Sequence, residues 1–576
     1  KPAQVRYVDD TTFTITLYSP KPLLLQSIAI DNKWMFCPKD WYKDIMAVNM
    51  DEPHWSGETD LKLIGGEGLV TVTEEEALAN AKARSELYTF EDYTKLCDQL
   101  GYRYWQYVGR PTLRPWNITS ALTEQTLVFE RNPYYWKVDA DGRQLPYVDK
   151  IEFVTVPEAY RAITLDTGED YTMPFGVQNF IDKMESYVPG SRESTTTFFA
   201  LADECRRAMA YLTKMRGNPD TAVLKSEYPN FMRVAAYPID KVLDAIKMPK
   251  KAQEILNVYW SYLGTPEDQL SFLHYALMVN LYITHGAQIP KNRSHGISCA
   301  LADTIIEKGG EIWYNAEVEH IITKNGKVAG VRFADGKEVA TEHVVSNASP
   351  HLVYGKMVDK ADIPEEELKL ANARGLAGRG VSMFLGLNKS HEELGLNDYS
   401  YFIYHSLDTK AEFGGMKSIE NPAQVTVCLN AALPDCSPKG TTILYFTSLY
   451  FSDFFGDIAN EENYFDIKEK MANCLIDGFE KATGAKIRDC IEEIEVGTPV
   501  TYAHYTGAPQ GAIYGYLLTG LDNMMPRIMC MYNEKHLPGL HFCGGHAMRG
   551  SGFNSSYQSG NLAAKFTLMD MKKEAE

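Results

Sequence analysis

The stretch HFCGGHAMRGSGFNSSYQSGNLAA, residues 541–564, decides the fold class. It begins as a short apolar strand, continues through a glycine-rich turn and enters a helix in which Ser559, Gly560, Ala563 and Ala564 are small. A strand, a glycine turn and a helix N-terminus in this order bring backbone N–H groups close to a phosphate. The stretch therefore predicts an α/β fold with a nucleotide at the turn.

Four glycines of the turn are candidate cofactor-binding residues, because glycine permits close backbone approach and positive φ angles. They are Gly544, Gly545, Gly550 and Gly552. The alternative interpretation is a tight connection between strand and helix that holds no ligand.

The first half of a dinucleotide site is not found in this chain. Such a site begins with G-x-G-x-x-G between a strand and a helix. Gly66 and Gly68 match the first two positions, but Thr71 stands at the third, and the following LVTVT favours a strand. No G-x-x-x-x-G-K-[ST] motif occurs either.

Composition excludes several classes of function. The formal net charge is −19 and the basic residues are scattered, which argues against nucleic acid as a partner. None of the ten cysteines forms a C-x-x-C pair, so we expect no metal site. The longest apolar stretch, 272–283, is too short to span a bilayer. The chain opens at Lys1 without a charged and apolar leader, so no signal peptide is visible in these residues.

Local patterns predict individual elements. Alternating apolar and polar residues predict a strand over residues 5–17. A capping box at Thr73–Glu76 predicts a helix that extends to about residue 87. A further helix is predicted over 90–100 and a strand over 126–131. Asn325-Gly326 and Asp335-Gly336 predict hairpin turns.

Residues from about 157 to 576 resemble the phytoene desaturase and carotenoid isomerase group of flavin-dependent oxidoreductases. The resemblance rests on motifs in the order of that family and includes the opening stretch. The motifs are MESYVPGS (184–191), YWSYLGTP (259–266), the helix and hairpin unit around 310–321, VVSNASPH (344–351) and TPVTYAHYTGAPQGAIYGY (498–516).

This resemblance implies FAD, extended in a Rossmann-like domain, and an apolar polyene as substrate. It implies that the backbone of Val318 touches the adenine, although a plain core residue is the alternative. Phe553 and Asn554 would lie at the flavin ring end. The flavin itself removes hydride, so no catalytic side chain is singled out. Residues 272–283 and 514–532 would line a substrate channel or belong to the core.

The family's G-x-G-x-x-G segment and its acidic ribose-binding residue would precede residue 157, and both are missing from this sequence. We therefore expect weak FAD binding and a colourless or partly loaded protein.

Residues 1–155 resemble instead the N-terminal lobe of an oligopeptide-type (family 5) solute-binding protein of an ABC importer. The resemblance is carried by RPTLRPW (110–116) and RNPYYWKVDADGRQLPYVDKI (131–151). Trp116 and Trp136 would stack on a peptide or, as we favour, pack in the core. The chain is thus predicted to be chimeric, joined at about 155–160.

The predicted architecture is α/β: an incomplete Rossmann-like FAD domain plus a substrate domain, preceded by a partial α/β solute-binding-protein lobe. The lobe covers residues 1–155 and is expected to pack as its own unit, and the flavin oxidoreductase-like region covers 156–576. Within the latter, the FAD-type part comprises 296–345 and 498–576, which should meet, and the substrate part comprises 160–290 and 350–495.

The favoured function is an FAD-dependent desaturase or isomerase of carotenoid-like polyenes. The alternatives are an extracytoplasmic oligopeptide-binding protein and an inactive fusion of two gene fragments. The expected location is the cytoplasm or the inner face of a membrane, with peripheral contact left open, or outside the cytoplasm if residues 1–155 direct export. The oligomeric state is also left open.

Overall fold

The computed structural model describes residues 4–9, 12–16, 73–84, 114–121, 126–139, 142–156, 158–215, 218–420, 422–519, 536–547 and 550–575, with isolated positions such as 522 and 527. The chain divides into two compact units. The first comprises residues 1–155 and 289–311, and the second comprises 156–288 and 312–576. The first unit therefore extends beyond the predicted 1–155.

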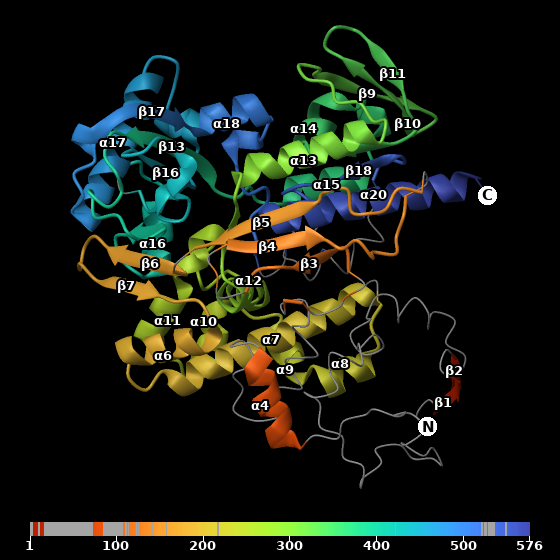
Figure 1. Cartoon of the computed structure of the whole chain (residues 1–576). Coiled ribbons are helices and arrows are strands. Elements are labelled where there is room, and N and C mark those ends of the chain that lie inside the picture. Colours follow the sequence, from red (N-terminus) through yellow and green to blue (C-terminus); the bar gives the residue numbers. More distant parts are fainter. Residues whose placement is uncertain are drawn as a thin grey trace. The chain divides into compact units, whose positions relative to one another are not determined.

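The first unit contains a hairpin, a helix and a four-stranded sheet. Strands β1 (Gln4–Asp9) and β2 (Thr12–Thr16) pair antiparallel, where the sequence predicted one strand over 5–17. The sheet has the order β3-β4-β5-β8, and its orange strands lie side by side in Figure 1. The elements are α4 (Glu74–Arg84), β3 (Trp116–Ile118), β4 (Thr126–Arg131), β5 (Lys150–Thr155), β8 (Gln288–Pro290) and α13 (Arg293–Glu307).

Residues 289–311 join this unit because β8 lies beside β5 in the sheet and α13 follows β8. Lys308 Nζ then lies 2.6 Å from Asp139 Oδ2. Trp116 is half-buried and donates its Nε1–H to Val148 O at 3.1 Å. Trp136 is 67% exposed, so the prediction that it packs in the core is wrong.

A seven-stranded sheet organises the second unit, in the order β17-β13-β16-β15-β14-β6-β7. Only the β14–β6 pair is parallel among these described strands. Helix α17 (Tyr464–Thr483) packs on one face through Met471, Leu475 and Phe479 (Figure 1). The strands are β6 (Tyr160–Thr164), β7 (Asp170–Met173), β13 (Arg379–Leu387), β14 (Ser400–Tyr404), β15 (Gln424–Cys428), β16 (Thr442–Tyr450) and β17 (Ile491–Gly497).

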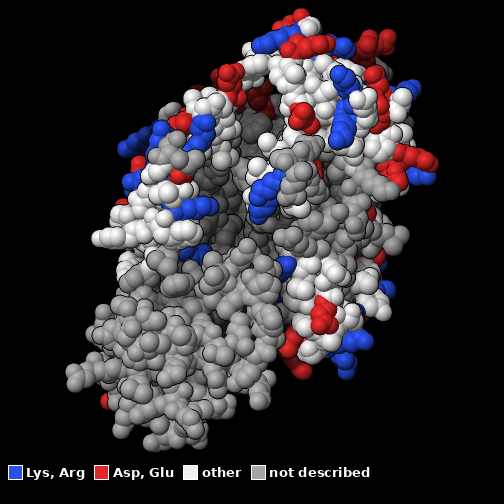
Figure 2. Space-filling model, turned by 90° about the vertical axis from the view of Figure 1, so that its right-hand side faces the viewer, with Lys and Arg blue, Asp and Glu red and all other residues white. Residues whose placement is uncertain are grey.

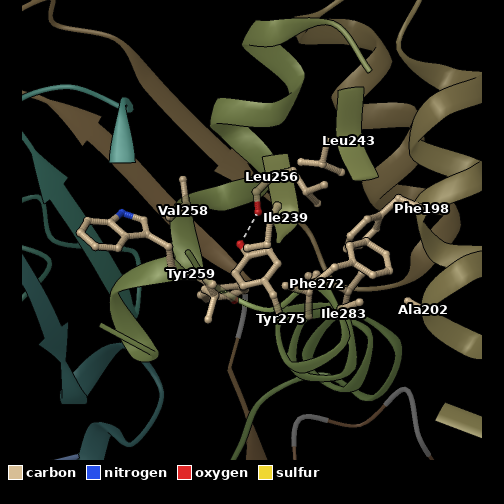
Figure 3. Packing of buried hydrophobic residues seen from close by; sticks show 14 of the residues in the cluster. Phe198, Ala202, Ile239, Leu243, Leu256, Val258, Tyr259, Phe272, Tyr275 and Ile283 are labelled. Carbon is tan, nitrogen blue, oxygen red and sulfur yellow. Dashed lines mark hydrogen bonds between the residues drawn. The ribbon is translucent and has the colours of Figure 1, made fainter. Parts of the chain in front are cut away.

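A helical cluster forms the largest apolar core. Its helices are α6 (Val177–Tyr187), α7 (Arg192–Lys214), α8 (Thr221–Glu227), α9 (Pro229–Val234), α10 (Ile239–Ala245), α11 (Lys250–Leu256), η3 (Asn257–Tyr262) and α12 (Phe272–His285). In Figure 3, Phe272, Tyr275 and Ile283 of α12 point among the surrounding helices. The Tyr275 hydroxyl donates to Leu256 O at 2.7 Å. Of the two roles predicted for residues 272–283, the buried side chains favour core packing.

A second group of strands in this unit carries the candidate site. Strands β9 (Val318–Lys324), β10 (Lys327–Phe333) and β11 (Glu338–Ala340) form an antiparallel sheet (green in Figure 1). Strand β12 (Val344–Ser346) pairs in parallel with β18 (Leu540–Phe542), although the two are far apart in sequence. The described helices of this unit not yet named are α14 (Pro350–Leu352), α15 (Glu365–Ala373), α16 (Thr409–Gly415), α18 (Pro499–Thr506) and α20 (Phe553–Ala575). Of these, α20 contacts β12 and β18.

The described surface carries both signs of charge. Figure 2 shows Lys and Arg side chains interspersed with Asp and Glu on one face. Over the part of the chain that the structure describes, no helix has both the length and the hydropathy that a membrane span requires.

Candidate functional site

The predicted glycine turn begins at the carboxyl ends of two parallel strands. Val344 lies opposite Leu540 and Ser346 opposite Phe542, and the N–H of Cys543 donates to Ser346 O at 2.9 Å. In open α/β sheets, ligands bind beyond the carboxyl ends of the strands. The turn between β18 and α20 therefore lies where a cofactor site is expected.

Gly544 holds the turn against both β12 and α20. Its φ is +84°, and a Cβ at this position would lie 1.7 Å from Asn347 Oδ1. Its N–H donates to Ser559 Oγ at 2.8 Å, and Ser559 is buried in α20. Packing alone therefore requires glycine at position 544.

The other three glycines surround the turn differently. Gly545 is approached by Gly515, since a Cβ on Gly515 would lie 2.5 Å from Gly545 O. Gly550 and Gly552 have φ angles of +79° and +102°. A Cβ on Gly552 would meet no described atom within 4 Å. The turn is therefore tightly packed at its start and open near its end.

The remaining predicted residues occupy separate places. Phe553 begins α20 and is 68% exposed. Asn554 Oδ1 accepts a hydrogen bond from Gln558 Nε2 at 2.6 Å. Val318 begins β9, is half-buried and pairs with Phe333, in a different sheet from the turn.

That sheet is nonetheless joined to β18. The N–H of Val328 in β10 donates to Pro538 O at 3.0 Å, and Val328 shares an apolar cluster with Leu540. The structure thus brings the four glycines together, whereas Val318 is linked to them only through neighbouring elements.

A cavity of about 60 Å³ lies beside the turn, among side chains of α15, β18 and α20. Its polar lining includes Glu367, Arg374, Tyr516, Arg527, His546 and Ser559.

Two arginines in this lining share one carboxylate. Arg527 donates from Nε to Asp522 Oδ1 at 2.6 Å and from Nη2 to Oδ2 at 2.9 Å. Arg374 Nε lies 3.2 Å from the same Oδ2, and its guanidinium lies 5.1 Å from the Tyr516 ring centroid. The arrangement fixes both guanidinium groups at the cavity.

His546 contributes a neutral ring to the same cavity. It meets Tyr516 edge-on, with ring centroids 5.3 Å apart. Burial, with smaller effects of the nearby His351 and Arg527, lowers the pKa of His546 to about 4. The imidazole is therefore uncharged at neutral pH.

Arg374, Asp522, Arg527 and His546 were not predicted from the sequence. The first three stand outside the glycine stretch and in no recognisable motif. His546 lies inside the stretch, so its place between two glycine positions was the one available signal. Within the described ranges no three His, Cys, Asp or Glu side chains are grouped to hold a metal ion.

No protein-family model matches the chain. In sequence it is 25% identical over 391 residues to an all-trans-retinol 13,14-reductase of Danio rerio, covering 63% of each chain. It is 27% identical over 292 residues to a chloroplastic prolycopene isomerase of Daucus carota, covering 50% of this chain and 45% of the relative. It is 23% identical over 323 residues to a 4,4'-diapolycopene oxygenase of Methylomonas sp, covering 56% of this chain and 63% of the relative. The chain spans less than two thirds of the length of each.

Two solved structures give more distant likenesses. An oxidoreductase from Methanosarcina mazei has a TM-score of 0.43 at 15% identity, covering 72% of this chain and 82% of that one. Cyclohexylamine oxidase from Brevibacterium oxydans has a TM-score of 0.45 at 13% identity, covering 73% and 83%. The three sequence relatives are, by name, a reductase, an isomerase and an oxygenase.

Proposed function

We propose that this chain is an FAD-dependent oxidoreductase or isomerase that acts on apolar polyenes of the carotenoid or retinoid kind. The observation that carries the proposal is the sequence similarity to the retinol reductase over 391 residues. The prolycopene isomerase and the diapolycopene oxygenase support the same substrate class, since their names also denote conjugated hydrocarbon chains.

The described residues fit one part of such a cofactor. The glycine turn presents backbone beyond the ends of β12 and β18, and a cavity whose lining includes Arg374 and Arg527 adjoins it. When bound, FAD would supply the hydride acceptor or donor. In this proposal Gly550 and Gly552 admit the cofactor close to the backbone, Val318 contacts the adenine, and Phe553 and Asn554 lie toward the ring.

The division of the second unit is part of the proposal. Residues 296–345 and 498–576 would hold FAD, and 160–290 and 350–495 would bind the substrate. The pairing of β12 with β18 supports bringing the first two segments together. Helix α13, which falls in residues 296–345, belongs to the other compact unit and does not add to that support.

We also infer a weak affinity for FAD. A first G-x-G-x-x-G segment between a strand and a helix is missing from the sequence. Several charge-assisted hydrogen bonds to the diphosphate would then be missing, each worth about 1.5–3 kcal/mol. We expect the purified chain to be colourless or partly loaded.

The test uses the full chain. Purified protein is mixed with FAD, passed through a gel-filtration column and scanned at the flavin absorption bands. The reduced and oxidised protein is then incubated with all-trans-retinol or prolycopene, and the products are separated by chromatography. Conversion that depends on added FAD would support the proposal. Loss of all flavin at every concentration, together with no conversion, would contradict it.

A role in peptide binding is the second candidate, and it rests on residues 1–155 alone. Trp136 and Tyr134 are 67% and 85% exposed, which leaves two aromatic rings available for a ligand. Titration with a mixed oligopeptide library, followed by tryptophan fluorescence, tests this role. A fluorescence change on adding peptide that is lost in Trp136→Ala would favour peptide binding. A fluorescence spectrum that does not change on adding peptide would count against it.

A further inference from the structure

Two polar side chains are buried in the layer between the seven-stranded sheet and α17. Gln424 and Thr426 of β15 are 2% and 0% exposed. In β16, Ser448 lies opposite Gln424 and Phe446 lies opposite Thr426. The Phe446 ring meets the Phe479 ring of α17 at a centroid distance of 5.3 Å. Because directly opposed residues of an antiparallel pair share one face, Gln424 and Thr426 lie on the face that α17 covers (Figure 1).

Four polar atoms in this layer have no hydrogen-bond partner among the described residues. They are Gln424 Nε2, Gln424 Oε1, Thr426 Oγ1 and Tyr450 Oη, the last from the same face of β16. Exchanging the nitrogen and oxygen of the Gln424 amide would satisfy neither position, since both are unpaired. Buried polar atoms are costly to leave without a partner, so these four atoms point to a ligand.

Other hydroxyl groups on the same face already have protein partners. Ser448 Oγ donates to Ala423 O at 2.7 Å, and Thr442 Oγ1 donates to Lys389 O at 2.7 Å. Unpaired polar atoms are therefore not a general property of this face of the sheet.

Helix α17 has a glycine where it passes over Gln424. A Cβ on Gly478 would lie 3.1 Å from Gln424 Nε2. The amide thus lies against the backbone of α17, whose carbonyl groups in mid-helix accept hydrogen bonds from within the helix. Because position 478 carries no side chain, a small ligand can reach the amide at this point.

The chemistry of the three side chains selects the ligand. An amide and two hydroxyl groups carry no charge at neutral pH, and burial raises the pKa of Tyr450 above its usual value. An ion would therefore have no counter-charge among these side chains, and burying an unpaired charge is costly. The amide needs both an acceptor and a donor, and each hydroxyl can be either. The small neutral molecule that both donates and accepts is water.

We propose that ordered water molecules bind between β15, β16 and α17 and bridge the Gln424 amide to the hydroxyl groups of Thr426 and Tyr450. Buried waters typically make about three hydrogen bonds to polar groups that would otherwise be unsatisfied. The waters then belong to the fold, because they complete the hydrogen bonding of the layer that joins α17 to the sheet. This hydration site is independent of the proposed flavin function.

The first experiment compares two threonine-to-valine changes in the full chain by urea denaturation. Valine has nearly the shape of threonine but lacks the hydroxyl group. We expect Thr426→Val to raise the equilibrium constant of unfolding roughly threefold to tenfold, because a bound water loses a partner. Thr442→Val is the matched control, since it loses a direct hydrogen bond to Lys389 O and should show a loss of the same order. If Thr426→Val leaves the constant unchanged or lowers it, the layer is dry and the proposal is overturned.

A double-mutant cycle tests whether the same waters join the two hydroxyl groups, which share no direct hydrogen bond. If water bridges them, the effects of Thr426→Val and Tyr450→Phe should not be independent. The double variant should then lose less than the product of the two single fold-changes, whereas independent effects would overturn the bridge. Circular dichroism identifies a variant that fails to fold, and the other single variant then carries the comparison with Thr442→Val.

A crystal structure of the full chain tests the waters directly. We expect electron density within hydrogen-bond distance of Gln424 Nε2, Gln424 Oε1 and Thr426 Oγ1. In crystals of Thr426→Val, one water should be lost or displaced. A well-ordered layer that shows no such density in the parent would overturn the proposal.

Discussion

Gly544 is a position at which a side chain does not fit. Its φ of +84° strains any L-residue, and a Cβ would lie 1.7 Å from Asn347 Oδ1. We expect Gly544→Ala to lower the free energy of unfolding by about 2–4 kcal/mol, because backbone strain and displacement of Asn347 add together. Urea denaturation followed by circular dichroism measures the change.

Gly560 offers a matched control in the same segment. It lies within α20, and a Cβ there would meet nothing within 4 Å. Gly560→Ala should be neutral or stabilise by about 0.5–1 kcal/mol, since alanine favours a helix over glycine. Equal losses in both variants would show that the contact with Asn347 is not the cause.

His274 makes stability depend on pH. The residue is 7% exposed, and burial, with a smaller effect of Arg527, lowers its pKa from 6.5 to about 4. A depressed native pKa means that the unfolded chain takes up the proton first. The stabilisation is therefore complete above about pH 6.5 and is lost as the pH falls toward 4. The loss amounts to about 3 kcal/mol.

His274→Leu removes this titrating group. We expect the variant to lose less unfolding free energy than the parent between pH 6.5 and 4, as measured by denaturation at each pH. A parent and variant with identical slopes would rule out His274 as the source. His546, with a pKa also lowered to about 4, would contribute to the slope that remains.

The site shows what local sequence can reveal. The glycines of the turn were visible because their need for positive φ is a property of the residue itself. Arg374, Asp522 and Arg527 carry no such signal, because their roles arise only when the fold brings them to one cavity. Their ion pairs depend on tertiary contacts that no spacing encodes.

At the scale of elements, the β9–β10 hairpin depends on its two turn residues. Asn325 and Gly326 have φ angles of 55° and 71°, and Lys324 pairs with Lys327. We expect Gly326→Ala to lower the free energy of unfolding by about 1 kcal/mol. Backbone strain alone is the cause, since a Cβ there meets nothing within 4 Å. Thermal denaturation measures the loss.

Asn325→Gly is the matched change in the same turn. It relieves a positive φ at a non-glycine residue, so the free energy of unfolding should stay within about 0.5 kcal/mol of the parent. If Asn325→Gly were as destabilising as Gly326→Ala, side-chain contacts rather than backbone geometry would control this hairpin.

Elements with strong local signals were predicted well. The Asn-Gly hairpin and the strand at 126–131 are confirmed. The Thr73–Glu76 capping box is confirmed by hydrogen bonds in both directions, at 2.8 and 3.2 Å. The strand over 5–17 is wrong, because the same alternation continues through both strands of the β1–β2 hairpin and no glycine marks the turn. The helix predicted over 90–100 lies outside the described residues.

At the scale of the whole molecule, two compact units predict unfolding in more than one step. The calorimetric enthalpy should then exceed the van't Hoff enthalpy. Leu273 is fully buried in α12 of the second unit. Leu273→Ala should lower the free energy of unfolding by about 2–5 kcal/mol. Only one of the calorimetric transitions should then shift to a lower midpoint temperature. A single component with equal enthalpies would contradict this expectation.

Because β8 and α13 belong to the first unit, that unit is completed late in synthesis. The first unit needs residues 289–311, yet residues 156–288 belong to the second. A ribosome adds about 5–20 residues per second, so the early segment waits roughly eight to thirty seconds until residue 311 has been added. During that interval the exposed edge of β5 is open to chaperones, proteases and other nascent chains. Slowing translation just before residue 289 should therefore raise misassembly more than the same pause after residue 311.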